Sequence, residues 1–132
     1  MIDDEMERFT EMWAFYNSSP NGILILDEDS KILVANRAME TFTGYSTREL
    51  HHMNVSKLIP PGVKNPHADK LSLVIENGAG PRDMKPLSAV PLLRKDGETV
   101  KVDVERRVYR YMDERRFAGI VTPARAVLLS FE

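Results

Sequence analysis

Residues 34–50 decide the fold, and they read VANRAMETFTGYSTREL. The stretch leaves an apolar strand at Asn36, whose side-chain oxygen we expect to accept a hydrogen bond from the first turn of a helix over residues 37–43. Gly44 ends that helix, because glycine takes the left-handed conformation without a steric penalty. Residues 46–49 then read STRE, a capping box that predicts another short helical turn.

Two strands and a helix are predicted before this stretch. Residues 23–26 form a short apolar run, and residues 31–35 form a second one, separated by a polar turn. This pattern is typical of a β-hairpin. Upstream, residues 3–16 predict an amphipathic helix with a broad apolar side, formed by Met6, Phe9, Trp13, Phe15 and Tyr16.

The second half of the chain predicts a helix and then three strands. The helix begins at Pro66 and carries an apolar stripe at the spacing of one helix face, formed by Leu71, Val74 and Ile75. Strands follow over residues 84–93, 100–105 and 117–121, with a hairpin turn at Asp96-Gly97 between the first two. Pro86 and Pro91 place the first of these strands at a sheet edge or a bulge. Thr122-Pro123 indicates the start of a closing helix.

The order of these elements predicts an α+β fold with one five-stranded antiparallel sheet and short helices on one face. We expect three segments in the chain. They are an N-terminal flanking helix over residues 1–17, the folded domain over residues 18–122 and a C-terminal extension over residues 123–132.

This order, together with four local motifs, resembles the PAS family of sensory domains. The motifs are SPNGILILD at 19–27, the N-x-A…F-x-G-Y…E-L pattern within 34–50, RKDG at 94–97 and FAGIV at 117–121. The resemblance implies a sensory or regulatory module without enzymatic activity, which binds a small ligand, mediates dimerisation, or does both. It also implies an effector partner such as a histidine kinase. The helix over residues 3–16 either forms a homodimer with its twin or covers its own sheet, and both alternatives stay open.

The resemblance carries one cofactor hypothesis. His67 lies where haem-binding PAS sensors have the axial ligand of the iron, so a haem-based gas or redox sensor is the alternative function. Ser88 stands where those sensors have a distal arginine, which speaks against this alternative. Flavin is a less favoured cofactor, and the absence of cysteine excludes cysteine-based flavin photochemistry.

The sequence leaves open whether the core is filled or contains a pocket. The expected pocket wall is entirely apolar and comprises Ile23, Ile25, Leu33, Phe42, Leu58, Leu71, Val74, Ile75, Val102 and Ile120. Of these, Leu71, Val74 and Ile75 lie on the same predicted helix as His67, and with it they are the candidate cofactor-binding residues.

Composition narrows the class of protein. The 132 residues carry 18 Lys and Arg against 20 Asp and Glu, a net charge of −2, so the basic excess of a nucleic-acid-binding protein is missing. Arginines between residues 106 and 116 are interspersed with acids, which predicts a solvated, salt-bridged strand face.

No segment reaches the roughly 18 apolar residues of a membrane span. We therefore expect a cytoplasmic domain, with a small enzyme as a remote alternative. His51-His52 is expected in a surface loop rather than at a metal.

Overall fold

The computed structural model describes residues 4–62 and 82–125. The elements in chain order are α1 (Asp4–Ser18), β1 (Gly22–Leu26), β2 (Ile32–Ala35), α2 (Arg37–Thr43), α3 (Thr47–Leu50), the 3-10 helix η1 (Val55–Leu58), β3 (Arg82–Leu93), β4 (Thr99–Tyr111) and β5 (Glu114–Pro123). The predicted helix that begins at Pro66, with Leu71, Val74 and Ile75, lies outside the described residues.

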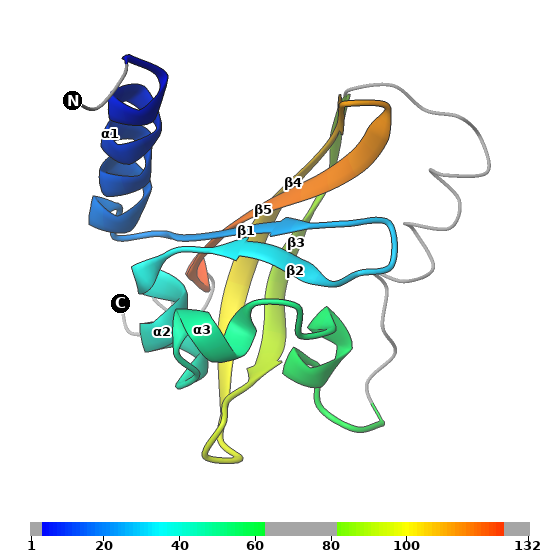
Figure 1. Ribbon diagram of the computed structural model, residues 1–132. Coiled ribbons are helices and arrows are strands. Elements are labelled where there is room, and N and C mark those ends of the chain that lie inside the picture. The colour runs from blue at the N-terminus through cyan, green and yellow to red at the C-terminus, as the bar shows by residue number, and fades with distance from the viewer. Residues whose placement is uncertain (1–3, 63–81, 126–132) are drawn as a thin grey trace.

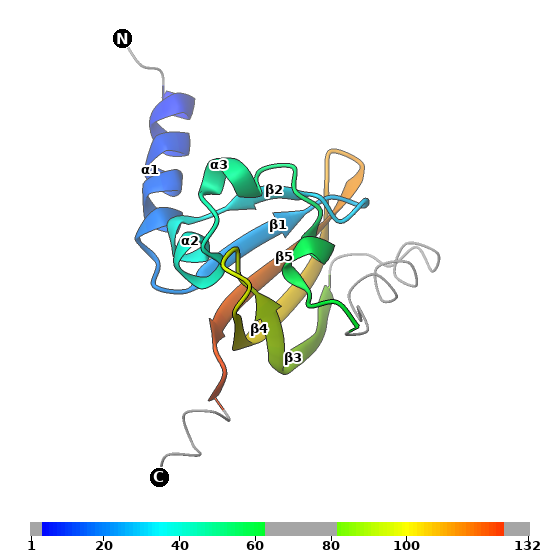
Figure 2. The same ribbon diagram turned by 90° about the horizontal axis from the view of Figure 1, so that it is seen from below.

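The strands form one antiparallel sheet in the order β2-β1-β5-β4-β3, so the α+β prediction is confirmed. Helices α2, α3 and η1 cover one face, whereas α1 projects from the other side of the sheet (Figures 1 and 2). The core lies between the sheet and α2, α3 and η1, where Leu26, Met39, Leu50, Leu58 and Phe117 are almost fully buried. The boundaries expected at residues 17/18 and 122/123 stay predictions.

Strands β4 and β5 are longer than the sequence pattern predicted. They pair without a break from Val102–Pro123 to Tyr111–Glu114. The predicted helix start at Thr122-Pro123 is wrong, because Thr122 pairs with Asp103 and Pro123 ends the strand. A proline is tolerated at a strand end, where its missing N–H breaks few ladder hydrogen bonds.

Asn36 is wholly buried and does not cap α2 with its side chain, contrary to the prediction. Its Oδ1 accepts a hydrogen bond from the Ile23 amide at 2.9 Å. Its Nδ2 donates to the Tyr16 carbonyl at 2.7 Å and to the Asn21 carbonyl at 3.0 Å. The side chain therefore joins the last turn of α1 to the beginning of β1, and its own backbone leads into α2.

The remaining turn and cap predictions around α2 and α3 are confirmed. One contact was not predicted: the Oδ1 of Asn17, which comes before β1, accepts from the Arg37 amide at 3.0 Å in place of the expected Asn36 cap. Gly44 ends α2 in the left-handed conformation with φ of 78°. Ser46 and Glu49 form the capping box of α3, each side chain accepting from the other residue's amide.

The hairpin between β3 and β4 bonds to the helices α2 and α3. Arg94 Nη1 donates to the carbonyls of Thr41 and Phe42 at 2.7 and 2.8 Å. These two carbonyls belong to the last turn of α2, where the helix itself offers no amide to pair with them. Lys95 Nζ lies 2.7 Å from Glu49 Oε2 of α3. The hairpin thus holds both helices over the core.

We predict that Asn36→Ala lowers the free energy of unfolding by about 2–4 kcal/mol, because each partly buried backbone group left without a partner costs about 1–3 kcal/mol. Urea unfolding followed by circular dichroism measures the change. The matched control is Asn54→Ala, which removes an exposed cap on the Ser56 amide and should cost about 1 kcal/mol. Equal losses in the two variants would contradict the bridging role of Asn36.

Candidate functional site

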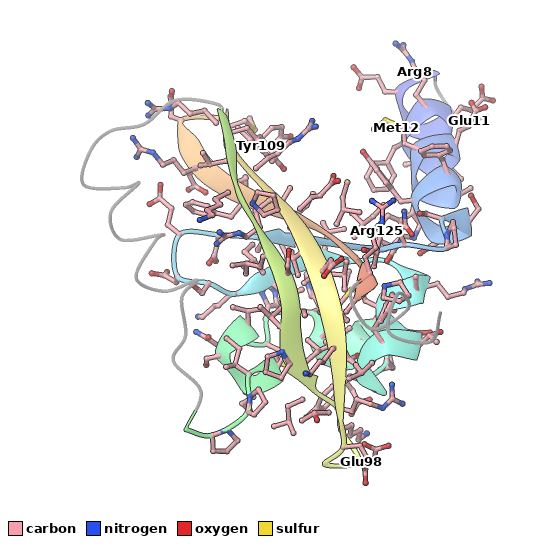
Figure 3. All side chains as sticks on the ribbon, turned by 180° about the vertical axis from the view of Figure 1, so that it is seen from behind. Arg8, Glu11, Met12, Glu98, Tyr109 and Arg125 are labelled. Carbon is pink, nitrogen blue, oxygen red and sulfur yellow. The ribbon has the colours of Figure 1, made fainter. Side chains whose placement is uncertain are left out.

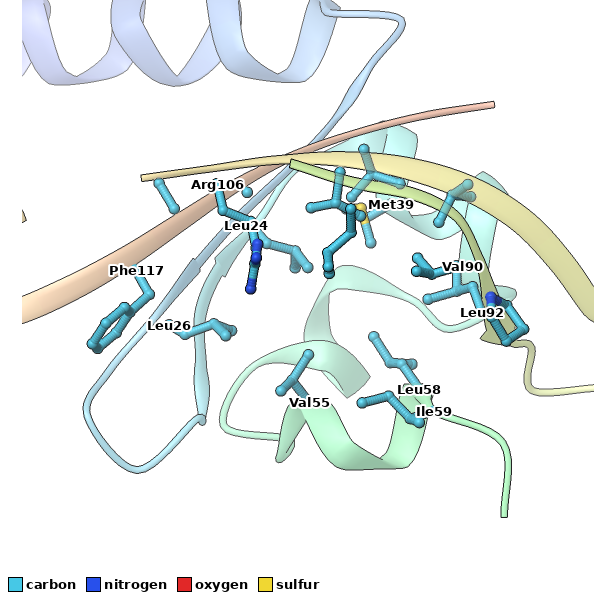
Figure 4. Close-up of a pocket in the computed structure, with 17 residues that line it drawn as sticks. Leu24, Leu26, Met39, Val55, Leu58, Ile59, Val90, Leu92, Arg106 and Phe117 are labelled. Carbon is cyan, nitrogen blue, oxygen red and sulfur yellow. The ribbon is translucent and has the colours of Figure 1, made fainter. Parts of the chain in front are cut away.

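A cavity of about 180 Å³ lies between the sheet and the helices α2 and η1 (Figure 4). Its described walls are formed by residues of β1, β3, β4 and β5, by Met39 of α2 and by η1 with the following Ile59. They are apolar with one exception: Leu24, Leu26, Met39, Val55, Leu58, Ile59, Leu87, Val90, Pro91, Leu92, Val102, Val104, Phe117, Ala118, Gly119 and Val121, together with Arg106. A well-packed core holds few voids larger than a water molecule, so this space is suited to a ligand.

The predicted wall is correct in part. Leu58 and Val102 line the cavity. Ile23, Ile25 and Ile120 were assigned to it wrongly: their neighbours Leu24, Leu26 and Val121 point inward, and Ile120 is 38% exposed. The run ILIL of β1 is apolar on both faces, so its pattern does not reveal which face is inside, and a slip of one residue reverses every side chain.

Other predicted residues are not among the described walls. Leu33 is half-buried elsewhere on β2, and Phe42 packs against the core from α2 without lining the cavity. His67, Leu71, Val74 and Ile75, the candidate cofactor-binding residues, lie outside the described residues.

Arg106 lies inside the domain, and the predicted solvated strand face is wrong at this residue. The side chain is 4% exposed and its guanidinium points into the cavity (Figure 4). The signal was present in the sequence. Val100, Val102 and Val104 alternate with polar residues, and continuing that period places Arg106 and Val108 on the same inward face.

The guanidinium is held on one side and open on the other. Nε and Nη2 of Arg106 donate to the Lys85 carbonyl at 3.2 and 2.6 Å. Nη1 is buried and has no hydrogen-bond partner among the described residues. Burial lowers the pKa of Arg106, since the charged form loses water there, yet an arginine side chain remains protonated in proteins.

The partner carbonyl is available because β3 bulges at this point. The pairing of β3 with β4 shifts register between Met84 and Leu87, and Pro86 lies inside that interval. Because β3 is an edge strand and proline donates no hydrogen bond, the prediction of an edge or bulge is confirmed. Lys85 is released from the ladder, and its carbonyl meets Arg106 instead.

The Asp103 carboxylate makes a further contact on the outer face of the same strands. Asp103 Oδ1 accepts from the Ala89 amide at 2.8 Å, and Oδ2 accepts from the Arg125 amide at 3.0 Å. These two hydrogen bonds, that of Arg125 first, hold the pKa of Asp103 below its ordinary value. Asp103 therefore joins the irregular part of β3, next to the cavity-lining Val90, to the residue that follows the sheet.

The described part of the chain holds neither a candidate metal site nor a candidate membrane span. His51 and His52 are exposed, and no group of three or more His, Cys, Asp or Glu within residues 4–62 and 82–125 is placed to hold a metal ion. Over the same residues, no helix is both long and apolar enough to span a membrane.

Comparison with known families agrees with this architecture. The family model for the PAS fold matches residues 10–124. The chain belongs to the PAS family. The resemblance predicted from the sequence motifs is thereby confirmed, and the cavity lies inside the PAS domain, between its sheet and its helices.

Relatives of the PAS domain come from signalling proteins. The sensor histidine kinase TmoS of Ectopseudomonas mendocina is 28% identical over 87 residues, which cover 66% of this chain and 8% of that protein. The PAS domain of an HTR-like protein from Haloarcula marismortui is 21% identical with a TM-score of 0.71, covering 88% of this chain and 91% of that one. The PAS domain of nitrogen regulation protein NR(II) from Vibrio parahaemolyticus is 20% identical with a TM-score of 0.65, covering 85% and 96%. The two solved structures share the fold, and PAS domains are sensory modules.

Proposed function

We propose that this PAS domain is a sensory module that binds a small molecule in its cavity and regulates an effector such as a histidine kinase. The observation that carries the proposal is the cavity of about 180 Å³ between the sheet and the helices. An apolar protein cavity of about 150 Å³ takes up a molecule the size of benzene, so the space suits a small organic ligand. The similarity to a sensor histidine kinase supports the choice of effector.

We propose a non-catalytic role for the cavity. Among its described walls, Arg106 is the one side chain that carries a charge, and a guanidinium is a poor general acid or base because it holds its proton. The walls described include no nucleophilic side chain. A small enzyme on this scaffold remains the remote alternative.

Haem binding through His67 stays a prediction, because that residue lies outside the described part of the chain. The histidines of the described part, His51 and His52, are exposed and do not line the cavity. Flavin binding and the expected cytoplasmic location likewise stay predictions.

We further propose that the domain forms a homodimer through α1. Several large apolar side chains of this helix are exposed, among them Phe9 at 71% and Phe15 at 72%. Figure 3 shows Arg8 and Glu11 of α1 projecting away from the sheet, and the hydrogen bonds to Tyr16 and Asn17 join its last turn to the domain. These exposures favour a twin helix over the alternative that α1 covers its own sheet.

The spacing along α1 suits a partner helix. Its apolar residues include a set separated by three, four and three positions, the seam spacing of packed helix pairs: Met6, Phe9, Trp13 and Tyr16. An exposed apolar strip on a small domain is typical of an interaction surface.

Filling the cavity should abolish ligand binding. Val104 lines the cavity from β4, so Val104→Phe places a ring in the space. We expect native mass spectrometry and a thermal-shift screen of metabolites to find a ligand that raises the Tm of the original chain by about 5 °C or more and leaves Val104→Phe unchanged. Lys101→Phe, on the exposed face of the same strand, is the control and should respond like the original chain. Equal responses of the original chain and Val104→Phe would show that the cavity is not the binding site.

Disrupting the α1 surface should separate the dimer without unfolding the domain. We expect the original chain to have the mass of a dimer by light scattering, and Phe9→Gln combined with Trp13→Gln to weaken dimerisation at least about a hundredfold. Tyr111→Gln combined with Met112→Gln removes exposed apolar side chains at the β4–β5 turn and should leave the dimer intact. The α1 dimer is refuted if the Phe9/Trp13 variant keeps both its fold and its dimer mass.

A further inference from the structure

We propose that the ligand of this cavity is a carboxylate with an apolar body, whose carboxyl group binds the open side of the Arg106 guanidinium. This inference rests on the proposal that the cavity holds a ligand, and it names the chemical class of that ligand.

Arg106 has hydrogen-bond donors left after its contact with the Lys85 carbonyl. A guanidinium carries five N–H groups, one on Nε and two on each Nη. The Lys85 carbonyl takes the side formed by Nε and Nη2. The opposite side, formed by Nη1 and the second hydrogen of Nη2, is a two-donor fork, and Nη1 has no partner among the described residues. Such a fork matches the two oxygens of a carboxylate.

The charge of the guanidinium also favours an anionic partner. A buried cation is costly unless an anion neutralises it. Burial lowers the pKa of Arg106, and no carboxylate of the described residues offsets this effect. The Lys85 carbonyl brings a dipole and no charge. A bound anion would supply the missing negative charge, whereas a cationic ligand would be repelled.

Water is a weaker partner for Nη1 than an anion. A buried water is retained where about two to four polar groups hold it. Arg106 is the one polar side chain among the described walls, so these walls offer no second polar side chain to hold a water beside Nη1.

The cavity walls indicate that the rest of the ligand is apolar. The walls around the guanidinium are aliphatic and aromatic, with Leu24, Leu26 and Phe117 on the sheet side and Val55 on η1 (Figure 4). A phosphate or sulfate would bring further charged oxygens that find no donor side chain among these residues. A monocarboxylate with a hydrocarbon chain or ring places its charge on Arg106 and its apolar part against these walls.

The test compares three probes in isothermal titration calorimetry with the 132-residue chain. Octanoate carries both the carboxylate and the chain, 1-octanol keeps the chain without the charge, and acetate keeps the charge with almost no chain. We expect octanoate to bind more tightly than either of the other two.

The variants isolate the guanidinium. Arg106→Met should weaken octanoate binding about ten- to a hundredfold, because it removes hydrogen bonds to a charged group. The same variant should bind 1-octanol at least as well as the original chain does, which also shows that its cavity is intact. Arg107→Met makes the same change one residue away, where the side chain is exposed on the other face, and should leave octanoate binding unaltered. Arg106→Gln provides a second variant if the methionine variant does not fold.

Two outcomes would overturn the carboxylate ligand. If octanoate binds equally to the original chain and to Arg106→Met, or if 1-octanol is preferred by the original chain, then the cavity binds apolar molecules and the proposed sensory function survives without the carboxylate. If octanoate does not bind at millimolar concentration, the carboxylate inference fails. The metabolite screen with Val104→Phe then judges the cavity itself independently.

Discussion

The unbroken pairing of β4 with β5 determines which side chains face the core and the cavity. Ten consecutive pairs, from Val102 to Tyr111 on β4, hold the strand without a bulge, so its side chains alternate strictly between the two faces. Val102 and Val108 must face the core, because they are almost fully buried there. Arg106 lies between them at the same parity and is forced inside. The charge in the cavity is thus a consequence of the register of the sheet.

The neighbouring strand β3 supplies a hydrogen-bond acceptor for this charge because its pairing is irregular. Where β4 is regular, β3 shifts register around Pro86 and turns the Lys85 carbonyl toward the guanidinium. That contact satisfies one side of the guanidinium and fixes the direction of the other. On the outer face, Asp103 holds Ala89, in the irregular part of β3, and Arg125, which follows the sheet. A ligand on Arg106 would therefore lie against β3. Asp103 connects this strand to Arg125 through its two hydrogen bonds.

Local signals in the sequence predicted the local structure well. Gly44, the Ser46–Glu49 capping box and Asp96-Gly97 specify their own conformations within a few residues, and all three are found as expected. Asn36 was assigned to a local cap, yet its side chain bonds to groups 13 to 20 residues away, which no local pattern encodes. The two-sided apolar run of β1 concealed its inward face. Arg106 stands among other charged residues in the sequence, so its inward position follows only from the strand period that begins at Val100.

We expect the Arg106 guanidinium to serve a ligand rather than the fold, and the free energy of unfolding of ligand-free Arg106→Met distinguishes these two roles. Urea unfolding of this variant, compared with the original chain after any bound ligand has been removed by refolding, gives the value. We expect an equal or higher free energy of unfolding, because methionine replaces the apolar stem of the arginine and carries no buried charge. Val108→Ala, on the same face, should lose about 2 kcal/mol and calibrates the measurement. If Arg106→Met instead lowers the free energy of unfolding by more than about 1 kcal/mol, the arginine stabilises the fold through its hydrogen bonds to Lys85, and the ligand-binding role is contradicted.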